Sequence, residues 1–87
     1  MEYKYIGKVT HFFDRIRVAV LALEDELYLE DWVLFEGPRT ELEQQVQSMQ
    51  IEHAAVDVGH PGEEVAIKLD DVVRVGDEVF LIEPEEA

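Results

Sequence analysis

The sequence contains no cysteine, no asparagine, one serine and two threonines. Without cysteine it has no disulfide, no thiolate nucleophile and no sulfur-ligated zinc. The single serine, Ser48, lies among glutamines with no nucleophile-elbow pattern around it, which argues against a Ser–His–Asp hydrolase. The glycine-rich loops that bind nucleotide phosphates are absent, which excludes GTP hydrolysis in practice. These absences predict a protein that is not an enzyme and needs no cofactor.

Basic residues are also scarce. The chain has seven Lys and Arg against 21 Asp and Glu, a formal net charge of −14. Residues 1–17 hold four of the seven basic residues and two of the acidic ones, whereas residues 18–87 hold three basic and 19 acidic residues. Nucleic-acid binders are usually basic, because neutralising phosphates supplies most of their affinity. We therefore expect no DNA binding, and RNA contacts only through residues 1–17.

Long hydrophobic runs are missing as well. The longest strongly apolar stretch, Val18–Leu23, is far shorter than the roughly 20 residues that span a bilayer. The N-terminal residues show no signal-peptide pattern, so the sequence predicts a cytoplasmic protein with no membrane contact. With 87 residues, 47% of them hydrophobic, the chain is long and apolar enough for one small domain. We place this domain at residues 1–82 and an acidic tail at residues 83–87.

Hydrophobic patterning predicts mainly strands. Alternation over residues 3–13 predicts a strand with one face formed by Tyr3, Tyr5, Val9, His11 and Phe13. The apolar run over residues 17–23 predicts a second strand buried on both faces, and the two form a hairpin. Residues 29–35 and 75–81 form a weak internal repeat, in which a turn ending in Asp precedes a strand.

Residues 40–53 fit two structures. Thr40–Glu43 matches a helix capping box, and Leu42, Val46 and Met49 recur at helical spacing. As a strand, the same segment needs a bulge near Gln47–Ser48 to point these side chains to one face. The local pattern favours the helix.

The remaining polar residues give no metal or acid–base signature. His11, His53 and His60 have no metal-ligand spacing between them. The pairs Glu63–Glu64 and Asp70–Asp71 are adjacent on extended chain, so their side chains point to opposite faces. We interpret them as a solvated acidic surface.

A resemblance emerges from the order of several segments: Ile6–Val9, the run ending at Leu23, Leu27–Gly37, Gln45–Gln50, Pro61–Lys68 and Val73–Val79. Over residues 3–82 the chain resembles the β-barrel domain 2 of translational GTPases such as elongation factor Tu. The same domain occurs alone in translation elongation factor-like proteins and at the C-terminus of collagenase-like peptidase family proteins. The resemblance implies an all-β, closed, six-stranded antiparallel Greek-key-like barrel, and it makes residues 40–51 a strand. Glu30 and Ala66 stand where the family usually has glycine.

In elongation factor Tu this barrel helps to hold the 3′ end of aminoacyl-tRNA, and the residues at that pocket correspond here to Gln50 and Glu64. A carboxylate at Glu64, where an amide is usual, opposes an anionic RNA end. The leading hypothesis is therefore a barrel that docks a protein or ribonucleoprotein partner of the translation apparatus. The contact candidates are Tyr3, Lys4, Tyr5, Lys8, Arg15, Arg17, Gln50 and Glu64.

Two alternatives remain open at this stage. One is a direct RNA-binding module that uses the basic N-terminal hairpin. The other is an accessory domain for a separately encoded peptidase-like or RNA-modifying enzyme. The charge of −14 is compatible both with a high-salt environment and with an acidic docking face, and the sequence does not define the oligomeric state.

Overall fold

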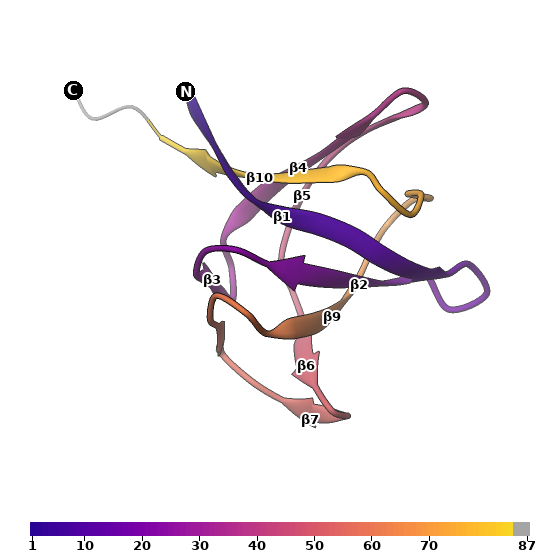
Figure 1. Ribbon diagram of the computed structural model, residues 1–87, viewed down its shortest axis with the longest axis vertical. Helices are drawn as coiled ribbons and strands as arrows, with labels where there is room; N and C mark the ends of the chain where they lie inside the picture. The colour runs from indigo at the N-terminus through magenta and orange to yellow at the C-terminus, as the bar shows by residue number, and fades with distance from the viewer. Residues whose placement is uncertain (85–87) are drawn as a thin grey trace.

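Every regular element in the described residues, 1–84, of this computed structural model is a β-strand (Figure 1). The strands are β1 (Glu2–Phe13), β2 (Val18–Leu23), β3 (Leu27–Tyr28), β4 (Trp32–Gly37), β5 (Thr40–Gln45), β6 (Met49–Ile51), β7 (Ala54–Ala55), β8 (Val58–Gly59), β9 (Glu64–Lys68) and β10 (Glu78–Glu83). The all-β prediction is confirmed, and within residues 1–84 no helix is available to cross a membrane. The predicted tail overlaps β10 at Glu83, and residues 85–87 lie outside the described part.

Eight strands form one antiparallel sheet in the order β5-β4-β10-β1-β2-β9-β6-β7, and β3 pairs with β8. The sheet has eight strands rather than the expected six, partly because residues 40–51 are divided in two, and its end strands β5 and β7 are not paired with each other, so the expected closure of the barrel is not shown. β5 pairs with β4, β6 pairs with β9, and the residues from Val46 to Ser48 separate them. The strand prediction for this segment is confirmed and the local helix prediction is wrong. The interruption shifts the alternation of side chains between the two faces. Leu42, Val46 and Met49 therefore all point to the core although the segment is not a helix.

Two irregularities in β1 overturn the predicted strand face. The pairing register shifts between Tyr5 and Gly7 and again between Val9 and His11. Each shift moves the following side chains to the other face. Ile6 and Val9 are therefore buried, whereas Tyr3 and Phe13 are half exposed. Gly7 is required at the first shift, because a Cβ there would overlap the carbonyl oxygen of Ala22.

The core is mostly aliphatic and is formed mainly by side chains from β1, β2, β4, β6, β9 and β10. Its fully buried members include Phe35, Ile6, Leu21, Leu27, Met49 and Ile67. The buried Gln44 is satisfied by its neighbours, since its Oε1 accepts the N–H of Asp70 at 2.8 Å and its Nε2 donates to the carbonyl of Lys68 at 3.1 Å. This amide fixes the segment that follows β9.

Three four-residue turns share one design: Tyr28–Asp31, His60–Glu63 and Arg74–Asp77. In each, the N–H of the fourth residue donates to the carbonyl of the first, at 3.0 to 3.1 Å. The fourth residue's carboxylate accepts the N–H of the first, at 2.7 to 2.9 Å. The third residue has positive φ, as in a type II turn, and is Glu30 (75°), Gly62 (89°) or Gly76 (94°).

Each of these turns clamps one buried residue: Val46 between β5 and β6, Leu23 of β2 and Val9 of β1, respectively. The carbonyl oxygen of the clamped residue accepts a hydrogen bond from the N–H of the turn's third residue. The N–H of the clamped residue donates to the carbonyl oxygen of the turn's fourth residue, and both distances are 2.8 to 2.9 Å. The clamped side chains are at most 3% exposed. The weak repeat seen in the sequence corresponds to the first and third of these turns. The middle one lies at Pro61–Gly62, where the sequence predicts a turn before a strand but no copy of the repeat.

Candidate functional site

A groove of about 520 Å³ lies on the outer surface between two hairpins. One is the β1–β2 hairpin and the other is the tight turn that joins β6 to β7; both project from the body of the sheet (Figure 1). We call this the hairpin groove, and its lining residues are Phe13, Ile16, Val18, Val20, Gln50, Glu52, His53, Glu64 and Ala66.

Small side chains on adjacent strands create the floor of the hairpin groove. Val20 of β2 is the register partner of Ala66 of β9, and Ala66 is the partner of Gln50 of β6. Register partners point to the same face, so these three side chains form one row across the sheet. Because Ala66 extends only to Cβ, the row is lowest at its centre. The half-exposed Phe13 and Ile16 form a wall at the hairpin tip.

The opposite wall carries strained backbone. Glu52 and His53 connect β6 to β7 and have φ values of 49° and 69°. Two successive residues with positive φ in a two-residue loop correspond to a type I′ hairpin turn, which normally uses Asn-Gly. A left-handed conformation costs a residue with a Cβ about 1 kcal/mol or more. Such strain is concentrated at functional sites, which supports the hairpin groove as the candidate site.

Polar groups are placed along the groove's edge. The Thr10 hydroxyl contacts both a Glu64 carboxylate oxygen and the carbonyl oxygen of Val20, each at 3.2 Å. The contact with Thr10 of β1 therefore helps to fix the position of the Glu64 side chain, which belongs to β9. With Gln50, Glu52 and His53 the edge offers an amide, two carboxylates and an imidazole above an apolar floor. This arrangement suits a flat or aliphatic group with a hydrogen-bonding edge.

The structure brings together only some of the predicted contact residues. Gln50 and Glu64 line the hairpin groove, and Arg15 and Arg17 lie in the adjoining hairpin turn. The Arg17 guanidinium lies 3.4 Å from the carbonyl oxygen of Asp70. Lys8 is the register partner of Glu78 on a different part of the surface. The predicted basic residues therefore extend along the hairpin rather than forming one patch.

The N-terminal half of β1 is occupied by internal contacts. Lys4 forms an ion pair with Asp25 at 2.8 Å, and this hydrogen bond raises the pKa of Lys4 and lowers the pKa of Asp25. Tyr5 donates to Glu24 at 3.0 Å, and burial together with this bond raises the Tyr5 pKa. Tyr3 lies in another depression, with Phe80.

Sequence reasoning missed most of the groove walls. Phe13 was assigned to a strand face, and Ile16, Glu52 and His53 received no role in binding. The available signal was Glu52-His53 itself, two residues without glycine between segments able to form strands. Among residues 1–84 no group of His, Asp or Glu is arranged to hold a metal ion. His60 instead contacts Glu26 at 3.1 Å, and the His11 ring packs on Phe13 with centroids 4.2 Å apart.

Comparison with solved structures defines the class of fold. The chain matches the crystal structure of the C-terminal domain of a putative U32 peptidase from Geobacillus thermoleovorans with a TM-score of 0.86 and 18% identity, covering 92% of this chain and 93% of that one. The selenomethionine variant of that domain gives a TM-score of 0.83 and 19% identity, covering 87% and 96%. The fold is therefore the one found at the C-terminus of that peptidase, and the predicted similarity to peptidase C-terminal domains is confirmed.

One curated protein is similar in sequence. An uncharacterized protease of Methanocaldococcus jannaschii is 40% identical over an alignment of 78 residues, and the match covers 88% of this chain. The chain spans only 19% of that protein's length. No protein-family model matches the sequence.

Proposed function

We propose that this chain is a non-catalytic accessory domain of a U32 peptidase-type enzyme. The observation that carries the proposal is the fold correspondence with a U32 peptidase C-terminal domain over nearly the whole chain, together with 40% identity to part of an uncharacterized protease. The proposal develops the alternative of an accessory domain for a separately encoded peptidase-like enzyme. It takes precedence over the translation adaptor, because one comparison names a putative U32 peptidase and the other an uncharacterized protease.

Within this function the hairpin groove binds part of the substrate or of the catalytic domain. Its apolar floor at Val20 and Ala66 gains from covering a nonpolar group, at about 25 cal/mol per Å². Gln50 and Glu64 at its edge select groups that donate or accept hydrogen bonds. The strained Glu52–His53 turn sets the groove's width.

The test uses the Methanocaldococcus jannaschii relative with its 78 matched residues deleted. We expect this truncated protein to bind the present chain in isothermal titration calorimetry. The variant Ala66→Phe, which fills the groove floor, should weaken binding at least about fivefold if the groove forms the contact. Val72→Phe, a similar enlargement at an exposed residue outside the groove, should leave it unchanged. A folded truncated protein, verified by circular dichroism, that binds neither form would contradict the proposal.

A second candidate is RNA binding by a translation-type barrel. The supporting observation is that β5 and β6 are consecutive along the chain and pair with β4 and β9, the two ends of the remaining series. If β5 and β6 were counted as one bent strand and β7 were left aside, that strand would join the two ends of the series β4-β10-β1-β2-β9, as a six-stranded barrel of the domain 2 type requires. The hairpin groove, which contains Gln50 and Glu64, would then lie on the outside of this barrel. A nucleobase stacked near Phe13 would suit this groove.

An amide NMR titration with a short RNA ending in unpaired CCA tests this candidate. Direct binding predicts shifts at residues 13–20 and around Gln50 and Glu64 that fade as salt rises. Charge reversal at Arg15 and Arg17, in the adjoining hairpin turn, should then reduce affinity. A spectrum that RNA leaves unmoved would eliminate this candidate and leave protein partners, whether peptidase-like or of the translation apparatus.

A further inference from the structure

The outward face of β5, β4, β10 and the first half of β1 shares no lining residue with the hairpin groove and has a regular order of its own. Glu41 is the register partner of Glu36, and Glu36 is the partner of Glu78. Three carboxylates therefore lie side by side on adjacent strands, and we call them the glutamate row. Lys8, the partner of Glu78, ends this row on β1.

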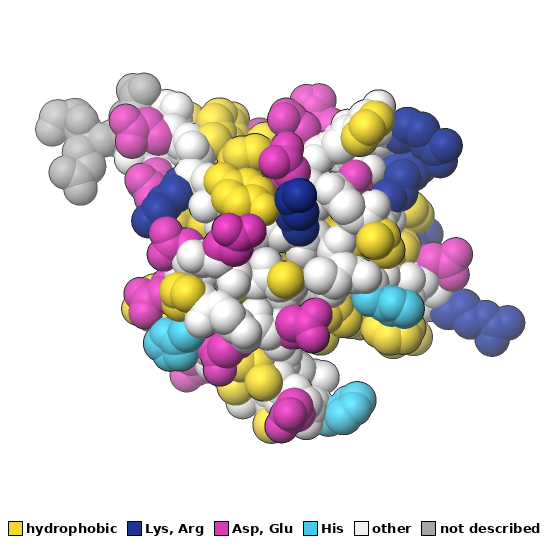
Figure 2. All heavy atoms as spheres, viewed as in Figure 1, with side chains coloured by type: hydrophobic (Ala, Val, Ile, Leu, Met, Phe, Trp, Pro, Cys, Tyr) yellow, Lys and Arg dark blue, Asp and Glu magenta, His cyan; other side chains and the backbone are white. Residues whose placement is uncertain are grey.

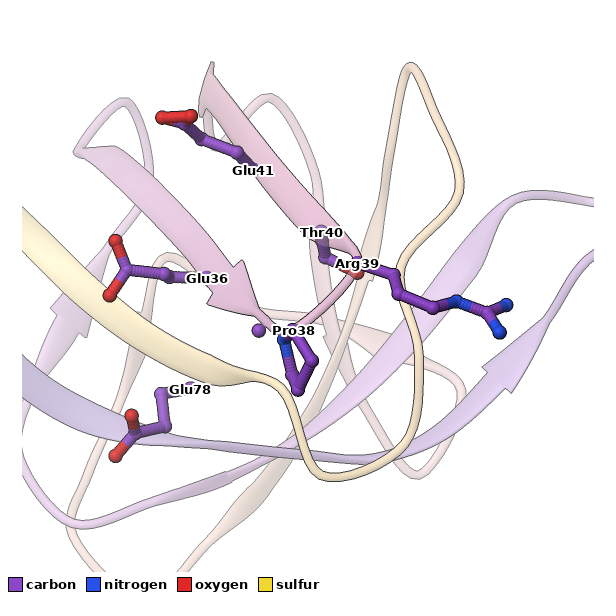
Figure 3. A pocket seen from close by; sticks show the side chains of 7 residues that line it. Glu36, Pro38, Arg39, Thr40, Glu41 and Glu78 are labelled. Atoms are coloured by element: carbon purple, nitrogen blue, oxygen red, sulfur yellow. The ribbon is translucent and has the colours of Figure 1, made fainter.

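The three carboxylates of the glutamate row form no ion pair within residues 1–84, and Lys8 faces Glu78 at the end of the row. Figure 3 shows Glu36, Glu41 and Glu78 extending to one side of a 660 Å³ depression, while the Arg39 side chain points the opposite way. The two side-chain ion pairs found within residues 1–84, Lys4–Asp25 and His60–Glu26, involve none of the three. Like charges placed directly opposite across strands destabilise a sheet. The fold retains this arrangement at a cost in stability.

Apolar rows run beside the glutamate row. The next row contains Leu34, Phe80 and Tyr5, which are successive register partners, with Glu43 at its end. The Tyr5 and Phe80 rings make an edge-to-face contact with centroids 5.8 Å apart. One depression of 310 Å³ is lined by both rows, including Leu34, Phe80, Glu36 and Glu41. The two rows thus form one continuous surface.

A third row extends the apolar surface toward the end of β10. It includes Trp32 and Tyr3, which are 51% and 50% exposed. Ile82 of β10 is the register partner of Tyr3, so it belongs to the same row on the strand between β4 and β1. Figure 2 shows hydrophobic side chains over β1 and β10 bordered by Asp and Glu side chains. We call the three rows together the glutamate–aromatic face.

We propose that the glutamate–aromatic face binds a positively charged segment of a protein partner, in which Lys or Arg alternates with apolar residues. Neighbouring strands are about 4.8 Å apart, so the glutamate row spans about 10 Å. Successive rows are about 6.8 Å apart, because they lie two residues apart on each strand. An extended segment lying between the first two rows directs cationic side chains to the glutamates and apolar ones to the partly exposed Tyr5 and Phe80. Nucleic acids and anionic membranes are repelled by the same carboxylates.

The test is an amide NMR titration with a capped hexapeptide of alternating arginine and leucine. We expect shifts confined to β4, β5, β10 and the first half of β1, and an affinity that falls about tenfold between 50 and 300 mM salt. A peptide of alternating glutamate and leucine should not bind. Hexa-arginine should bind more weakly, because it lacks the apolar contacts.

Charge-matched variants separate the face from net charge. Glu36→Gln with Glu41→Gln should weaken binding at least about fivefold and raise the melting temperature by about 3 °C, since repulsion is relieved. Asp14→Asn with Asp57→Asn removes the same charge elsewhere and should leave the affinity within about twofold. Equal weakening by both pairs, shifts spread over the whole molecule, or no binding by the arginine–leucine peptide would each overturn the proposal. The proposed accessory function does not depend on this outcome.

Discussion

Glu30 is the residue at which the sequence most clearly departs from what its backbone requires. It has a φ of 75° at the turn position where Gly62 and Gly76 stand in the equivalent turns. Relieving left-handed strain gains about 1 to 2 kcal/mol, whereas the extra freedom of glycine in the unfolded chain costs about 0.4 to 1 kcal/mol. We expect Glu30→Gly to raise the free energy of unfolding by about 0.5 to 1 kcal/mol, measured by urea denaturation.

The matched control is the reverse change at Gly76. A Cβ at Gly76 meets no atom within 4 Å, so Gly76→Ala tests backbone conformation without a collision. It should lower the free energy of unfolding by about 1 kcal/mol. If Glu30→Gly destabilised the protein while Gly76→Ala behaved as expected, the Glu30 side chain would have a stabilising role that its turn geometry does not explain.

At the residue scale, sequence reasoning identified some positions and missed others for definable reasons. Glu30 and Ala66 were singled out because glycine is usual there, and they occupy a positive-φ turn and the groove floor. The His60–Glu63 turn was predicted as a turn before a strand but not as a copy of the repeat, because it ends in Glu rather than Asp. The glutamate row was also missed, since it depends on strand register, which adjacent residues in a sequence do not reveal.

The three clamping turns are the elements that hold the strands at their irregular points. In the third turn, the buried Asp77 accepts the N–H of Arg74 at 2.8 Å. Asp77→Ala leaves this N–H without its acceptor, and we expect a loss of about 2 kcal/mol in the free energy of unfolding. Asp31→Ala removes the equivalent bond at a more exposed turn and should cost less, because water replaces the carboxylate. Equal losses would show that burial does not set the cost.

The β6–β7 turn allows strain and function to be separated. Glu52→Asn with His53→Gly installs the sequence that a type I′ turn prefers, and should raise the free energy of unfolding by about 1 kcal/mol or more. If the strained pair serves the hairpin groove, the same variant should weaken groove binding while Val72→Phe does not. Urea denaturation measures the change in stability, and the calorimetric titration with the truncated relative measures the change in groove binding. Greater stability with unchanged binding would remove these side chains from the site.

At the element scale, the prediction of strands was sound where hydrophobic runs were bounded by turns, as for β2 and β9. It was wrong about the faces of β1, because two register shifts reverse the alternation that the pattern assumes. For residues 40–51 the helical spacing of Leu42, Val46 and Met49 is produced by an interrupted strand. Such interruptions depend on the distant turn that clamps Val46, and no local window contains that information.

For the whole molecule, the net charge of −14 predicts self-repulsion that salt should relieve. The melting temperature should rise by several degrees between 20 and 500 mM sodium chloride, as the screening length falls from about 20 Å to about 4 Å. The source of the repulsion can be located with the two charge-matched double variants. If the glutamate row dominates, Glu36→Gln with Glu41→Gln should remove a large part of the salt dependence, whereas Asp14→Asn with Asp57→Asn should remove little. Equal effects would mean that repulsion is spread over the surface, as expected of adaptation to a saline environment rather than of a docking face.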